Sequence, residues 1–183
     1  MAGGHDERVV FGASVEALLR AFGPPWKPGA REALVKLGIE PEQPPRAAYP
    51  LELYMQLLKS LGEIHFPAAA EDERYFQMGQ AFIRGFERTL IGRAQLSLLK
   101  LIGPRRTLDR LTRSFRNANN YTTANLRELA SSHFEIDFGF VQFPGFYRGV
   151  LDGGLRAVGA ANLSVELARR EQMAATFSVR WTA

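Results

Sequence analysis

The sequence contains no cysteine, which excludes disulfide bonds, thiolate metal sites and a cysteine nucleophile and fits a reducing compartment. Histidine is scarce, because only His5, His65 and His133 are present, and their scatter does not match the spacing of a metal site. Long apolar runs are absent too, since the longest, 96–102, is interrupted by Lys100 and is far shorter than a membrane span. We therefore expect a soluble cytoplasmic protein that holds no metal and does not span a membrane.

The composition is that of an ordinary globular protein, with 46% hydrophobic and 23% charged residues, so disorder is not expected. A chain of 183 residues is long enough to bury a substantial core. The net charge of +4 is compatible with anionic partners but too small to indicate nucleic acid, which we consider an unlikely partner. We expect a single domain, 1–183, formed by a helical subdomain (1–120) and a mixed subdomain (121–183).

Apolar residues recur at helical spacing through the first subdomain and predict about six helices. These helices are expected to begin near Ser14, Pro28, Pro50, Glu71, Leu90 and Pro104. Residues 39–50 hold four prolines and are predicted to form an ordered linker. The helix over 90–102 is apolar over so wide an arc that we expect it at the centre of the protein.

From Tyr121 onward the period of the apolar residues falls to two, which predicts strands. The clearest strand carries Phe134, Ile136, Phe138 and Phe140 in alternation with more polar positions. Its expected antiparallel neighbour is 121–129, a helix follows from Pro144, and two further strands flank a turn at 170–172. The fold class is therefore α+β, with the order strand-strand-helix-strand-strand and a four-stranded antiparallel sheet whose apolar face the helices cover.

The stretch 103–121 concentrates positive charge, with five arginines and one acid over residues 103–116. Gly103 and Pro104 are typical of a helix end followed directly by a new helix. Because guanidinium groups match the geometry of acidic oxygens, Arg105, Arg106 and Arg110 are candidates to bind an anionic ligand or an acidic partner. The alternative is a solvated basic face that pairs with acids such as Glu128.

The asparagines that follow, Asn117, Asn119 and Asn120, have two interpretations. Asn117 and Asn120 are candidates to line a polar binding site. Asparagine clusters also form turns through bonds to their own backbone, and a structural corner of this kind would position Tyr121 and Thr122.

An aromatic group in the C-terminal part is a candidate wall for an apolar pocket, with Phe138 and Phe140 as its main ligand-binding residues, although plain core is the alternative. The group consists of Phe134, Phe138, Phe140, Phe143, Phe146 and Tyr147. The polar residues nearby do not indicate an enzyme, because Ser132 and His133 point to opposite faces of a strand. Asp152 and Glu166 are expected to form exposed ion pairs of small energetic value with Arg148 and Arg156, and Arg148 and Asp152 are four residues apart on one helix face.

Several segments resemble an uncharacterised bacterial family, known mainly from myxobacteria as a domain of unknown function. The segments are VFGASVEALLRAFG, AYPLELY, IGRAQLSLLKLIGPRRTLDRL, FRNANNYT and FYRGVLDGGLRAVGA with the following VELARRE and FSVRW. More distantly, the element order and the glycine-rich helix 149–153 are similar to the heme-NO/oxygen-binding (H-NOX) sensors and the 4-vinyl reductase ligand-binding domains. The resemblance implies a ligand-sensing module with a cavity between its helices and its sheet.

The heme of the H-NOX family is not implied by the residues at the corresponding positions. A heme needs an axial ligand, usually histidine. When Gly149 is matched to the family's glycine, Arg106 falls near the position of the axial histidine. The family's Tyr-x-Ser-x-Arg motif, which clamps the heme propionates, falls on Asp137, Gly139 and Val141. The resemblance therefore implies the fold without the heme.

We expect a non-enzymatic, heme-free module without a cofactor that binds a small apolar or amphipathic molecule. Phe138 and Phe140 would contact the apolar part of this ligand, and Arg105, Arg106 and Arg110 its acidic end. The alternative is a protein-interaction or scaffold domain without a cavity, which docks an acidic protein partner through the arginine-rich helix. The two hypotheses differ in whether the junction between helices and sheet is hollow.

Overall fold

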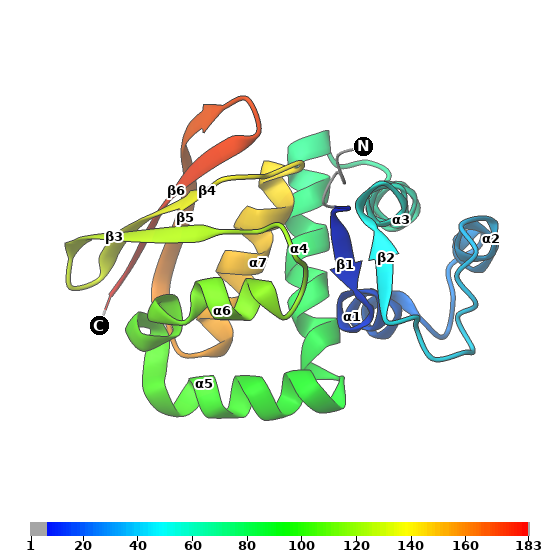
Figure 1. The fold of residues 1–183 in the computed structure, drawn as a ribbon, viewed down its shortest axis with the longest axis horizontal. Helices are drawn as coiled ribbons and strands as arrows, with labels where there is room; N and C mark the ends of the chain where they lie inside the picture. Colours follow the sequence, from blue (N-terminus) through cyan, green and yellow to red (C-terminus); the bar gives the residue numbers. More distant parts are fainter. Residues whose placement is uncertain (1–6, 183) are drawn as a thin grey trace, which may run out of the picture.

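The computed structural model describes residues 7–182 and has the predicted α+β architecture (Figure 1). The helices are α1 (Gly12–Phe22), α2 (Ala30–Lys36), α3 (Leu51–His65), α4 (Glu71–Glu87), α5 (Leu90–Asp109), α6 (Leu111–Arg116) and α7 (Pro144–Ala157). The strands are β1 (Val9–Phe11), β2 (Ala48–Pro50), β3 (Ala124–Ala130), β4 (His133–Phe138), β5 (Ala161–Glu171) and β6 (Ala174–Thr182). Within the described part of the chain, no helix is both long and apolar enough to traverse a membrane.

The C-terminal sheet has the strand order β3-β4-β6-β5, and every neighbouring pair is antiparallel, as predicted. In β4, Phe134, Ile136 and Phe138 are buried, and the alternate residues lie on the opposite, more exposed face. The turn of the last hairpin lies at 172–173 rather than at 170–172, because β5 continues to Glu171 and β6 begins at Ala174. Polar residues remain compatible with a strand here because β5 is at the edge of the sheet and most of its side chains face solvent.

A second, two-stranded sheet joins β1 to β2. Strand β2 lies at the end of the segment 39–50, which was predicted to be a linker. Val10 pairs with Tyr49 in this sheet, and both residues are almost completely buried. The pairing partner is about forty residues away, so local periodicity could not reveal it.

Helices α4 and α7 are in unusually close contact at the centre of the molecule (Figure 1). Gly145, Gly149 and Gly153 repeat every fourth residue along α7 and face α4. A Cβ atom at Gly149 would lie 2.1 Å from the carbonyl oxygen of Phe76, and one at Gly145 would lie 2.2 Å from that of Asp72. Glycine at these positions therefore allows the two backbones to touch.

Two hydrophobic cores lie on either side of this contact. One forms between the sheet and α7 and includes Phe134, Ile136 and Phe177. The other forms among α1–α4 and includes Leu18 and Met78. Phe146 of α7 packs against both cores and connects them.

The prediction that the apolar helix over 90–102 lies at the centre is wrong. Leu90 is 84% exposed and Leu101 is 83% exposed, and only Leu96 and Leu99 of its leucines are buried. Figure 1 shows α5 along the lower edge of the molecule, below α6. Because this helix is apolar on most of its circumference, the sequence could not indicate which side would be covered.

The helix break predicted at Gly103 and Pro104 is confirmed. Gly103 has φ 76° and ψ 177°, a backbone conformation that is essentially restricted to glycine, and α5 changes direction there. The predicted single arginine helix is instead two short pieces, because a second break falls at Arg110. Its arginines are consequently spread over the end of α5 and over α6.

Candidate functional site

A mainly apolar hollow of the described structure lies between helices. This outer cavity has a volume of about 470 Å³ and is enclosed mainly by α4, α5, α6 and α7. Its apolar lining includes Phe82, Ile83, Phe86, Leu96, Leu99 and Phe115. The first three lie within one helical turn of α4, so that they face α5 together. The expected cavity between helices and sheet is thus displaced toward the helices.

A smaller inner cavity of about 60 Å³ adjoins the outer cavity. The two share five lining residues: Ser14, Phe82, Phe115, Ala118 and Val150. The inner cavity is surrounded by residues of α1, α3, α4 and α7 and is lined by three tyrosines, Tyr54, Tyr121 and Tyr147. These tyrosines are the main hydroxyl groups near the centre of the molecule.

The tyrosine side chains of the inner cavity are in a low-dielectric environment. Burial raises the pKa of Tyr54, Tyr121 and Tyr147 above the ordinary value for tyrosine. All three hydroxyls are therefore protonated at neutral pH and can donate hydrogen bonds. The hydroxyl oxygen of Tyr147 lies 3.1 Å from Oγ1 of Thr122.

The asparagine segment forms a structural corner beside the inner cavity. Oδ1 of Asn119 accepts hydrogen bonds from the backbone N–H of Tyr121 at 3.1 Å and from that of Thr122 at 2.7 Å. Oδ1 of Asn120 accepts from the backbone N–H of Val9 at 2.9 Å. Asn119 thus positions Tyr121 and Thr122, as the second interpretation of these residues proposed, and Asn120 holds β1 in place.

Among the predicted ligand-binding residues, only Asn117 lines the outer cavity, and none lines the inner cavity. Phe138 is buried in the core next to the sheet, with its ring centroid 5.2 Å from that of Tyr147. Phe140 is half-buried against Tyr121, and the guanidinium of Arg8 lies 4.0 Å above its ring. The two phenylalanines therefore do not form one pocket wall. Of the wider aromatic group, Phe143, Phe146 and Tyr147 do line the inner cavity.

The three predicted anion-binding arginines are exposed and lie outside both cavities. Arg105 donates to Oε2 of Glu128 at 2.6 Å, as the alternative interpretation of this segment proposed. Arg106 and Arg110 form no ion pair with the described residues. Near them a groove of about 470 Å³ separates α6 from β3 and β4, and its ionisable lining residues are the acids Asp109 and Glu128.

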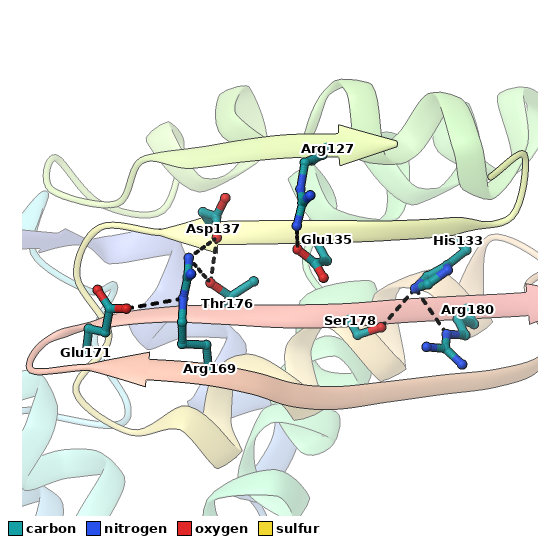
Figure 2. A network of polar contacts seen from close by, with 9 residues as sticks. All are labelled: Arg127, His133, Glu135, Asp137, Arg169, Glu171, Thr176, Ser178 and Arg180. Atoms are coloured by element: carbon teal, nitrogen blue, oxygen red, sulfur yellow. Dashed lines mark hydrogen bonds and ion pairs between the residues drawn. The ribbon is translucent and has the colours of Figure 1, made fainter. Parts of the chain in front are cut away.

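The solvent-facing side of the sheet carries a separate set of polar contacts (Figure 2). Nε2 of His133 lies 3.1 Å from Oγ of Ser178 and accepts a hydrogen bond from Nε of Arg180 at 3.1 Å. Along the same face, Asp137 accepts a hydrogen bond from Oγ1 of Thr176. Such exposed contacts contribute little to stability. They lie on the opposite face of β4 from the buried core, remote from both cavities.

The expected ion pairs of Asp152 are found in part, because Asp152 pairs with Arg156 but not with Arg148, and its carboxylate is buried. Asp152 is only 5% exposed because α4 covers this side of α7. Its Oδ2 accepts a hydrogen bond from Nε2 of Gln80 at 2.7 Å, and its Oδ1 accepts one from Nε of Arg156 at 3.0 Å. Arg148 pairs instead with Asp72 at 3.0 Å. The carboxylate of Asp152 thus contributes to the contact between α4 and α7.

The two histidines of the described part of the chain, His65 and His133, line neither cavity. The ring of His65, at the end of α3, lies 4.3 Å from that of Phe22, and burial lowers the pKa of His65 below its ordinary value. His133 is on the outer face of the sheet, and His5 lies outside the described residues. No group of residues within 7–182 has the composition and proximity of a metal site. The described lining residues therefore do not fit a histidine-ligated heme.

Sequence reasoning missed the participation of Tyr54 and the apolar residues of α4 and α5. Tyr54, Tyr121 and Tyr147 come from three separate segments, so no motif could connect them. The apolar residues of α4 and α5 had helical spacing, and this pattern does not distinguish a cavity wall from a packed core.

The fold is that of the H-NOX domains, as the sequence resemblance predicted. A doubly substituted Tt H-NOX matches with a TM-score of 0.65 and 13% identity, over 94% of this chain and 95% of that chain. A T. tengcongensis H-NOX mutant matches with a TM-score of 0.62 and 14% identity, over 94% and 97%. An oxygen-binding H-NOX domain related to soluble guanylate cyclases, in its oxygen complex, matches with a TM-score of 0.59 and 16% identity, over 94% and 95%.

The chain belongs to the family described as Protein of unknown function (DUF2378), whose model matches residues 8–182. A sequence comparison with curated proteins finds no match. The structural matches are too low in identity to show more than the fold.

Proposed function

We propose that this domain is a non-enzymatic, heme-free ligand-binding module, and that it holds a small apolar or amphipathic molecule in the outer cavity as part of a signalling process. The observation that carries the proposal is the outer cavity itself. Its volume of about 470 Å³ lies within the range of about 300–1,000 Å³ that is typical of small-molecule sites. Its lining is mainly apolar, with a few polar groups such as Gln95 and Ser114.

The weak attachment of α5 supports access to this cavity. Leu96 and Leu99 face the cavity, whereas Leu98 and Leu101 are exposed on other sides of the same helix. The side-chain contact between α5 and α6 includes a hydrogen bond of 3.3 Å from Nε2 of Gln95 to Oγ of Ser114. A helix with few buried contacts opens at a lower free-energy cost than a core helix, so that a ligand can enter beneath it.

The heme-free character is supported by the lining residues. Oxygen binding is described for a protein of the same fold, but the described lining of the two cavities contains no histidine, and the whole chain has no cysteine. These lining residues also include no carboxylate–histidine or hydroxyl–histidine pair for acid–base chemistry, which supports binding rather than conversion. The cytoplasmic location remains a prediction from the lack of cysteine.

The proposal is tested by filling the outer cavity. Leu99→Trp adds volume at a residue that lines the cavity, and Leu98→Trp adds the same side chain on the exposed side of α5. Native mass spectrometry of freshly purified protein identifies any co-purified molecule, and a thermal-shift screen of fatty acids, apolar ketones, nucleotides and heme supplies further candidates. A ligand at about 100 times its Kd stabilises the protein by about 2.7 kcal/mol.

We expect a ligand that stabilises the wild type and the Leu98→Trp variant but not the Leu99→Trp variant. The proposal fails if no compound changes the unfolding midpoint, or if the two variants respond alike. A stoichiometric Soret absorption in the purified protein would refute the heme-free character.

A protein-interaction domain is the second candidate, and two surface features favour it. Leu90 and Leu101 of α5 are highly exposed, and the arginines at the end of α5 and on α6 lie close by in the chain. An acidic partner with an apolar patch would complement both features. A ligand screen without any thermal shift would favour this candidate over the first.

A further inference from the structure

The inner cavity brings the hydroxyl of a buried tyrosine next to the outer cavity, and the inference drawn from it rests on the proposed function. The two cavities meet at Phe82, Phe115 and Val150, which line both of them. A ligand that displaces the side chains of Phe82 and Phe115 would join the two spaces. An elongated ligand in the outer cavity would thus reach the tyrosines with one end.

The hydroxyl of Tyr54 has no partner in the described structure. Tyr54 is only 6% exposed and lines the inner cavity, yet its hydroxyl forms no hydrogen bond with any residue from 7 to 182. Its oxygen is also not one of the side-chain polar atoms that are both completely inaccessible and without a hydrogen-bond partner. The hydroxyl therefore faces open space, and for a side chain this deeply buried that space is the inner cavity. A buried donor without a partner is costly, so a ligand or water group is expected to accept from it.

Two more hydroxyls lie near the hydroxyl of Tyr54. The hydroxyl of Tyr121 lies close enough to that of Tyr147 for the two to hydrogen-bond with each other. Tyr147 shares another hydrogen bond with Thr122, in which either oxygen can donate. Among the three tyrosines, Tyr54 is therefore the one whose hydroxyl has no acceptor within the described residues.

The charge around the inner cavity selects against an ionised ligand. None of its described lining residues carries a charge. Arg8, a nearby cation, lies over the ring of Phe140 and is not part of the lining. A carboxylate without a cationic partner is expensive to bury, whereas a neutral oxygen needs only a donor. The exposed arginines at 105, 106 and 110 lie outside the cavity and cannot compensate such a charge there.

We propose that the inner cavity receives the hydrogen-bond-accepting end of an uncharged amphipathic ligand, such as the carbonyl oxygen of a long-chain ketone, aldehyde or ester. The hydroxyl of Tyr54 donates to this oxygen, and the apolar body of the ligand occupies the outer cavity. The ligand class is therefore neutral and carbonyl-bearing, and differs from the acidic ligand that the arginine-rich segment suggested.

The test compares three probes with apolar chains of similar length: methyl octyl ketone, decane and decanoate. Their affinities are measured by equilibrium dialysis against the wild type, Tyr54→Phe and Tyr75→Phe. The control residue Tyr75 is equally buried and stacks on Phe143, but it lines neither cavity. Circular dichroism confirms that each variant is folded, and Tyr54→Leu, which also lacks the hydroxyl, is the substitute if Tyr54→Phe is not.

We expect Tyr54→Phe to weaken ketone binding about fivefold, because one hydrogen bond to a neutral acceptor is lost, and to leave decane binding unchanged. Tyr75→Phe should change neither affinity, and decanoate should bind the wild type more weakly than the ketone does. If ketone and decane both bind but Tyr54→Phe affects neither, or if decanoate binds more tightly than the ketone, this inference is overturned and the proposed function stands. If none of the probes binds the wild type, both are overturned.

Discussion

The contact between α4 and α7 provides the sharpest test of the fold, through the substitution Gly149→Ala. The added Cβ atom would lie 2.1 Å from the carbonyl oxygen of Phe76 and 3.0 Å from the backbone nitrogen of Gln80. An ordinary contact between such atoms is more than about 1 Å longer than the first distance. Both neighbours are backbone atoms, which cannot turn aside, so the two helices would have to separate.

The expected loss follows from this separation. A gap of about 0.5–1 Å removes a quarter to a half of the attraction across a packed interface. Overpacking of this kind lowers the free energy of unfolding by about 1–3 kcal/mol. Replacement of glycine by alanine inside a helix raises it by about 0.5–1 kcal/mol through helix propensity. We therefore expect Gly149→Ala to lower the free energy of unfolding by about 2 kcal/mol.

Gly154→Ala is the matched control on the same helix. A Cβ atom there would have only the Cδ1 atom of Ile83 nearby, at 3.8 Å, which is an ordinary contact. The control should leave stability unchanged or raise it by about 0.5–1 kcal/mol through helix propensity. Urea unfolding followed by circular dichroism measures both variants. A Gly149→Ala protein as stable as the Gly154→Ala protein would show that α4 and α7 are not in backbone contact.

Two further predictions concern ionisable side chains. Asp152→Ala should lower the free energy of unfolding by about 2 kcal/mol, because Gln80 and Arg156 lose a buried acceptor. The control Asp137→Ala, on the outer face of the sheet, should have little effect. Equal losses of the two variants in urea unfolding would contradict the burial of Asp152. Burial lowers the pKa of His65 in the folded protein, so on acidification the imidazole is protonated in the unfolded chain before it is protonated in the folded one. The contribution of neutral His65 to the free energy of unfolding is therefore fully present above the unfolded pKa of 6.5 and is lost as the pH falls toward the folded pKa. His65→Gln should therefore show a smaller loss of stability than the wild type between about pH 7.5 and about pH 5, and an unchanged pH dependence would refute the assignment.

The strands and most helices could be predicted because their signals are local. The alternation around Phe134 and Ile136 determines which face of β4 is buried, and a strand has only two faces to choose from. The helix break at Gly103 was equally predictable, since the residue type itself permits the backbone conformation found there.

The candidate site could not be predicted to the same extent, since its residues come from distant segments. Arg105, Phe138 and Asn120 were conspicuous in the sequence, yet none of them lies in either cavity. Arg105 forms an ion pair, Phe138 is part of a packed core, and Asn120 accepts a hydrogen bond from the backbone of β1. Tyr54 and Tyr121 had no distinguishing local pattern, and only the packing of α3 beside the corner formed by Asn119 brings both to the inner cavity.

The sequence by itself determined the α+β order, the orientation of the sheet and the lack of cysteine and of a heme-binding motif, because each of these depends on residue type or on spacing within one element. Only the tertiary structure decided that α5 is peripheral, that Asp152 is buried and that two adjoining cavities exist. These features depend on which surfaces meet across long sequence separations, such as α4 with α7 through their glycines. The shape and polarity of the space left between the elements follow from those contacts and are not encoded in any single segment.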